Sequence, residues 1–217
     1  MVSALRYDIR DASFEDFLVF LFAHDVAPSP ENLWYRRAEV DYDPQRIASY
    51  YIRLFSAPRV LRDRFSAAEL EQGFWAIQTG LRECSVRDLI WDRTVPLEIR
   101  EECVRSMADL YAQLFVDEPI DTSSNMWWDS LAYDWHSGNR AREKGGEDRL
   151  MQDVMFATLG KILELPVESC QKAALHGLGH LHHPDTHELV QSYLARNPTI
   201  APDLREYAVA AAEFRVL

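Results

Sequence analysis

Five of the seven histidines in this 217-residue chain lie close together. In order, they are His176, His180, His182, His183 and His187. His176 and His180 are four residues apart, and on a helix this spacing puts both imidazoles on one face, where they can bind one Zn²⁺. His183 or His187 would supply a third ligand from the next turn or helix. The segment is therefore a candidate zinc site, although Gly177 stands where a zinc-protease helix carries its glutamate general base.

A structural role is the alternative for the same histidines. Small residues are interspersed with them, namely Ala173, Ala174, Gly177 and Gly179, and they would let this helix pack closely on its neighbours. Histidines near the end of a helix also interact favourably with its dipole. We therefore expect no cofactor and assign no catalytic residue. Zinc bound by His176, His180, His183 and His187, in a metal-binding protein or a metal-dependent hydrolase, is kept as the alternative.

The second candidate site is an acidic, aromatic segment. Residues 116–135 contain five carboxylates and no Lys or Arg. If 124–135 is a helix, its residues fall on two faces, with Trp128, Leu131 and Trp135 on one and Asn125, Asp129 and Tyr133 on the other. Trp127 would then lie at the boundary, where a tryptophan beside carboxylates is typical of an interface anchor that attracts a basic partner. We predict a partner-binding site made of Asp117, Asp121, Trp127, Asp129 and Tyr133. The alternative is a buried tryptophan pair beneath a solvated acidic face.

The overall charge narrows the kind of partner. The formal net charge is -12, whereas a nucleic-acid-binding protein usually presents a basic surface to the phosphates. We expect a basic protein partner, no nucleic acid and no membrane, and the sequence leaves the oligomeric state open. The N-terminal residues show no secretion signal, and the three cysteines form no CxxC pair. These features predict a cytoplasmic protein with free, buried thiols.

The elements that must position these residues are mostly helical. Capping patterns start helices after Ser13, Ser66 and Ser85, the first running from about 14 to 24, and Asp43-Pro44 starts another that ends before Pro58. Gly80 is expected to end the helix that starts after Ser66, in the left-handed conformation. Residues 5–9 and 40–42 alternate apolar and charged side chains, and we expect extended connections there rather than strands. Residues 136–148, with adjacent glycines and many charges, predict a flexible loop.

The second half of the chain is repetitive. Helical patterns begin at Pro96, Pro166 and Pro202, at intervals of 70 and 36 residues. These intervals fit a period of about 35 residues, which is typical of antiparallel helix pairs stacked as a solenoid.

The segments ALHGLGHL, ELVQSYLARNP and LREYAVAAA resemble HEAT-like repeats, the helical pairs of armadillo-type proteins. The resemblance covers about 149–217 and reaches back toward 96, and the whole chain also looks like uncharacterised bacterial proteins of this helical kind. We expect an all-α fold and a single domain over 1–217. The resemblance implies a short HEAT-like α-solenoid at 149–217, after central helices at 81–135. Residues 1–80 do not match the repeat well, and we expect an irregular helical cap there. HEAT-like proteins mostly bind other proteins, and a few are DNA glycosylases or bilin lyases. We expect a non-enzymatic protein-binding module or scaffold, and immunity-type neutralisation of a basic partner is one role that fits.

Overall fold

A computed structural model describes residues 5–117, 120 and 122–216. Within these ranges the chain forms ten α-helices and one pair of short strands, so the predicted helical class is confirmed. The residues group into two compact units, one of Met1–Leu110 with Ile120–Ser123 and one of Tyr111–Pro119 with Ser124–Leu217. None of the described helices is long and apolar enough to cross a membrane.

The first unit contains the two strands. β1 (Leu5–Asp8) pairs in parallel with β2 (Ala38–Asp41), and the register sets Leu5 opposite Ala38. A parallel pair needs a crossover connection, which α1 (Phe14–Phe22) and two 3₁₀ turns (Pro30–Asn32 and Trp34–Arg37) provide. The expectation of unpaired extended connections was therefore wrong, because the intervening helix brings the two segments together.

Three further helices of the first unit begin where the capping residues predict, namely α2 (Pro44–Ser56), α3 (Ala67–Trp75) and α4 (Val86–Leu89). The last helix, α5 (Leu97–Leu110), follows Pro96. The Ser13 hydroxyl accepts from the Asp16 amide at 3.1 Å, and Asp43 accepts from the Arg46 amide at 2.7 Å. Each of these bonds satisfies a backbone donor that the first turn leaves free. Local chemistry is thus sufficient to set these helix starts.

Gly80 corrects one of the predicted helix ends. The chain does not turn left-handed there; α3 continues directly into a π-helical turn, Ala76–Gly80. The Tyr35 ring packs so closely that a Cβ on Gly80 would lie 2.4 Å from its Cδ2 atom. This glycine is needed for close packing against Tyr35 and not for a positive φ angle.

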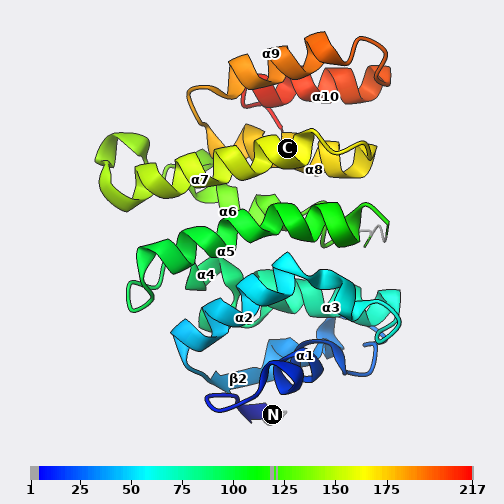
Figure 1. The fold of residues 1–217 in the computed structure, drawn as a ribbon, viewed down its shortest axis with the longest axis vertical. Helices are drawn as coiled ribbons and strands as arrows, with labels where there is room; N and C mark the ends of the chain where they lie inside the picture. The colour runs from blue at the N-terminus through cyan, green and yellow to red at the C-terminus, as the bar shows by residue number, and fades with distance from the viewer. Residues whose placement is uncertain (1–4, 118–119, 121, 217) are drawn as a thin grey trace. The chain divides into compact units, whose positions relative to one another are not determined.

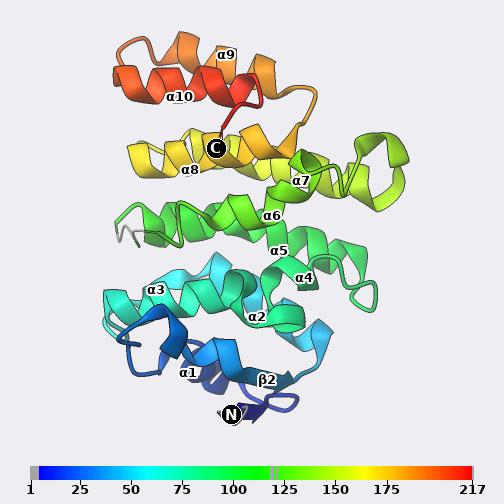
Figure 2. The same cartoon turned by 180° about the vertical axis from the view of Figure 1, so that it is seen from behind.

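In the second unit, α8 (Glu168–Leu181) is surrounded by other helices (Figure 1 and, from behind, Figure 2). It packs on α6 (Trp127–His136), α7 (Gly146–Leu163) and α10 (Pro202–Ala212), while α9 (Thr186–Arg196) packs on α10. A π-helical turn, Tyr111–Phe115, opens the unit, and a 3₁₀ turn, Arg142–Lys144, precedes α7. The helices predicted after Pro96, Pro166 and Pro202 are therefore present as α5, α8 and α10.

Gly177 brings α8 into close contact with α6. A Cβ at this position would lie 2.6 Å from the Trp128 Cβ atom and 2.7 Å from the Leu159 Cδ2 atom. Real Cβ atoms do not approach this closely, so only glycine allows the two helix backbones to come so near. The close packing predicted from the small residues of this segment is confirmed. It also carries the face of α8 that bears His176 and His180 up to α6.

The three cysteines are free and buried, as the sequence predicts. Burial raises the pKa of Cys84 to about 12 and that of Cys170 to about 11, and it also raises the pKa of Cys103. The thiolate is the reactive form of cysteine, so these three side chains are poor nucleophiles at neutral pH.

Candidate metal centre

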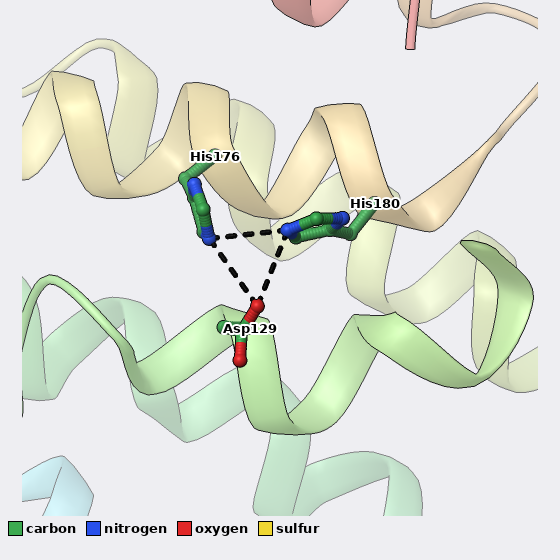
Figure 3. A group of neighbouring side chains, drawn as sticks. All are labelled: Asp129, His176 and His180. Carbon is green, nitrogen blue, oxygen red and sulfur yellow. Dashed lines mark hydrogen bonds and ion pairs between the residues drawn. The ribbon is translucent and has the colours of Figure 1, made fainter. Parts of the chain in front are cut away.

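His176 and His180 lie one turn apart on α8 and point at the same carboxylate on α6. Figure 3 shows both imidazoles directed toward Asp129. The two Nε2 atoms are 3.1 Å apart, and the Asp129 Oδ1 atom lies 3.2 Å from Nε2 of His180 and 3.5 Å from Nε2 of His176. Three potential donor atoms therefore form a nearly equilateral triangle.

The sides of this triangle match a metal coordination shell. Zinc binds nitrogen and carboxylate oxygen at about 2.0–2.2 Å, so two ligands of a tetrahedral zinc ion lie about 3.3–3.6 Å apart. The observed separations of 3.1, 3.2 and 3.5 Å are close to this value. The three atoms can thus occupy one face of a tetrahedron with little movement, which leaves the fourth vertex for a further ligand.

Burial keeps both imidazoles neutral. His176 and His180 are 7% and 3% exposed, and burial lowers the pKa of His176 although Asp129 acts in the opposite direction. The pKa of His180 falls to about 4, first through burial and then because its protonated ring would be repelled by a protonated His176. A metal binds the neutral imidazole, so both side chains are in the ligating form at neutral pH.

Hydrogen bonds alone cannot make all three contacts between these atoms favourable. If each Nε2 carries a proton, both N–H groups can point at the carboxylate, but they meet each other at 3.1 Å. If only one carries a proton, the lone pair of the other faces the negative oxygen of Asp129. Either arrangement contains one repulsive contact, whereas a cation at the centre is attracted to all three atoms.

The second ring nitrogens of the pair have different surroundings. His176 Nδ1 lies 2.6 Å from the Tyr207 hydroxyl of α10, the kind of partner that fixes the orientation of a ligating imidazole. His180 Nδ1 is buried and has no hydrogen-bond partner within the described part of the chain. His176 is therefore oriented by an outer hydrogen bond, and His180 is oriented by packing.

Two further histidines adjoin this triangle. His136 Nδ1 lies 3.2 Å from His182 Nε2, and the His136 ring is centred 5.0 Å from that of His180. His182 follows α8 in a left-handed backbone conformation and stacks on Phe214 at 4.5 Å. The second unit therefore brings four imidazoles together as neighbours, those of His136, His176, His180 and His182.

The alternative zinc site took its third ligand from His183 or His187, but the third donor atom beside His176 and His180 belongs to Asp129. His183 Nε2 donates to the Asp153 carboxylate at 2.9 Å, and its Nδ1 accepts from the Asp185 amide at 3.2 Å. Both ring nitrogens are used, so His183 has no lone pair left for a metal. His187 lies exposed on α9 and is absent from this group of potential ligands.

Asp129 belongs to the other candidate site in the prediction from sequence. There it lies on a partner-binding face, because nothing in the spacing connects it with histidines about fifty residues later. The available signal was Gly177, which predicts close packing of the histidine helix on a neighbour without saying which neighbour. The pairing of α6 with α8 is a tertiary contact, and it alone reveals the third donor.

The predicted partner-binding residues that the structure describes differ widely in exposure. Trp127 is fully buried, with its ring 6.3 Å from that of Phe115, which corrects its expected place at the boundary. Asp129 is half-buried against the histidines. Asp117 is exposed and Tyr133 is 48% exposed, whereas Asp121 lies outside the described residues. The tryptophan anchor of that hypothesis is therefore part of the core.

Comparison with known proteins gives no further guide to this site. The chain matches no model of a protein family, no curated protein and no solved structure. The candidate metal centre accordingly rests on its own geometry.

Proposed function

We propose that the protein binds one divalent transition-metal ion, preferably zinc, through Asp129, His176 and His180. The observation that supports this most strongly is the triangle of three donor atoms at 3.1, 3.2 and 3.5 Å, brought together from two helices. Two imidazoles and one carboxylate are a ligand set that suits zinc, and they are a poor match for calcium or magnesium, which prefer oxygen ligands.

Three protein ligands with a free fourth position are typical of catalytic zinc sites, whereas structural sites supply four. A zinc ion held in this way lowers the pKa of a bound water to about 7, which favours hydrolytic chemistry. In this proposal the chain's own residues present neutral nitrogens, supply one balancing negative charge and orient His176 through Tyr207. Gly177 supports the site by letting α8 approach α6 closely.

Metal content and affinity test this function directly. Protein prepared without a polyhistidine tag, loaded with zinc and desalted, is expected to retain one equivalent of zinc by mass spectrometry of the elements. His180→Asn should retain less than about a tenth of an equivalent, since tight zinc binding needs all of its ligands. The matched control is His187→Asn, which makes the same change on exposed α9 and should retain the wild-type amount. Loaded wild-type protein with less than about a tenth of an equivalent would refute the function.

A second candidate is a protein-binding role, as the HEAT-like resemblance implies. The observations in its favour are the net charge of -12 and the exposed ring of Tyr133. In this proposal a stacked-repeat, cytoplasmic scaffold binds or neutralises a basic protein, and Asp117 and Tyr133 are the remaining contact residues. Binding of a small basic protein, measured by calorimetry, should weaken in a Tyr133→Ala, Asp117→Asn double variant. Equal binding by the wild type and the double variant would exclude this surface.

A further inference from the structure

An open pocket adjoins the candidate metal centre within the second unit. Its volume is about 380 Å³, and it is lined by Asn125, Met126, Lys172, Ala173, His176 and Tyr207. His176 belongs both to this wall and to the donor triangle, so a molecule in the pocket would lie beside a bound metal. The volume is within the range of sites for small ligands, about 300–1,000 Å³.

Lys172 supplies the positive charge of the pocket. It precedes His176 by one helical turn, so both side chains leave α8 on the same face. Its ammonium lies 5.5 Å from the centre of the Tyr207 ring, close enough for attraction to the ring face. In a chain with a large excess of acidic residues, a lysine among these lining residues favours an anionic ligand.

Tyr207 supplies a hydrogen-bond donor once a metal is bound. A metal on His176 Nε2 leaves the ring proton on Nδ1, which then donates to the Tyr207 oxygen 2.6 Å away. The phenol keeps its own proton at neutral pH and can no longer direct it at Nδ1. Since Tyr207 also lines the pocket, this proton is available to a ligand there.

We propose that the pocket binds a small molecule through a carboxylate or phosphate group, held by the Lys172 ammonium and the Tyr207 hydroxyl beside the metal. The proposal rests on the metal-binding function above and names the class of ligand for that site. α6 begins at the same pocket, since Asn125 and Met126 directly precede Trp127, and the positive end of its helix dipole adds to the attraction. The metal ion would provide a further positive charge.

Inorganic phosphate and acetate serve as probes of the two oxyanion types. Calorimetric titration of zinc-loaded, desalted protein should show binding of at least one of them, and Lys172→Met should weaken that binding at least about tenfold. Lys172 is exposed, so this variant is expected to fold and to retain one equivalent of zinc. The matched control, Lys161→Met, removes the same charge from an exposed position on α7 and should bind the anion as the wild type does.

The outcomes separate this proposal from the function on which it rests. Equal anion binding by wild type and Lys172→Met, or no anion binding by protein that holds zinc, would overturn the pocket assignment and leave the metal centre standing. Wild-type protein that holds no zinc after loading would overturn both. Binding of acetate alone or of phosphate alone supports the proposal and identifies the group that the ligand carries.

Discussion

Two histidines lie three residues apart, one at the end of α8 and one in the loop that follows it. Their ring nitrogens differ in whether hydrogen bonds occupy them. His183 in the loop uses both ring nitrogens in hydrogen bonds, one to Asp153 and one from the Asp185 amide, and stacks on Phe156 at 4.0 Å. His180 on the helix has one nitrogen without a partner among the described residues, and its other nitrogen faces both His176 and Asp129.

This difference shows how a structural histidine can be distinguished from a candidate metal ligand. Both rings are almost completely buried, so burial does not distinguish them. What distinguishes them is whether the hydrogen bonds of the neutral ring are complete. His183 gains nothing from a metal ion, whereas the group around His180 contains a repulsive contact that a metal ion would remove.

The strongest predicted change is the loss of zinc affinity when His180, the candidate ligand of the two histidines, is replaced. His180→Asn should weaken zinc affinity at least about a hundredfold, because a nitrogen ligand is lost from a site with three protein donors. Competition with a coloured chelator measures this change. A variant with wild-type zinc affinity would show that His180 is as structural as His183.

The next prediction concerns His183, where a substitution should reduce stability and leave zinc binding unchanged. His183→Asn should lower the free energy of unfolding by about 1–3 kcal/mol, because buried groups lose their hydrogen bonds and the stacking on Phe156 is lost. Zinc affinity should remain that of the wild type. Urea titration and chelator competition on the same sample measure the two quantities, and a loss of zinc without a loss of stability would reverse the comparison.

A smaller effect is expected at the outer hydrogen bond of His176. Tyr207→Phe removes the hydroxyl that contacts Nδ1 and should weaken zinc affinity about tenfold, the lower end of the usual range for such partners. Phenylalanine keeps the ring and its packing, so the free energy of unfolding should fall only by the loss of one hydrogen bond, about 1 kcal/mol. Unchanged zinc affinity would mean that packing alone orients His176.

The last prediction concerns pH in the zinc-free protein. The pKa of His180 is about 4 when folded, and an unfolded histidine titrates near 6.5. Between these values the unfolded chain binds more protons at this residue, so the stability that His180 contributes is complete above about pH 6.5 and is lost as the pH falls toward about 4. The loss should be shallower in His180→Asn. Urea titrations at pH 7 and pH 5 measure it, and equal losses in both proteins would contradict the low pKa.

The helix starts and the helical class could be predicted from the sequence because local bonds set them. Ser13, Asp43 and Ser66 each cap the helix that they were expected to start. His176 and His180 could be paired for the same reason, since both lie on one helix face. Gly80 was misjudged because its role depends on Tyr35, which is distant in the sequence.

The remaining parts of the site depend on contacts between helices. Asp129 joins the histidines only because α6 packs on α8, and Trp127 is buried by the same tertiary structure that exposes Tyr133. His183 was placed among the ligands because spacing alone does not reveal the Asp153 carboxylate that occupies it. Periodicity indicates which residues share a face of one helix, and it does not indicate which helix that face will meet.

The most direct test of the metal centre is the position of a bound ion. Crystals of the full chain grown with zinc, with diffraction recorded on both sides of the zinc absorption edge, locate the metal without reference to any assumed site. We predict one strong anomalous peak bonded to Asp129, His176 and His180 at about 2.0–2.2 Å from each donor atom. A peak on His183 and Asp153, or no peak within the donor triangle of zinc-loaded crystals, would contradict the account.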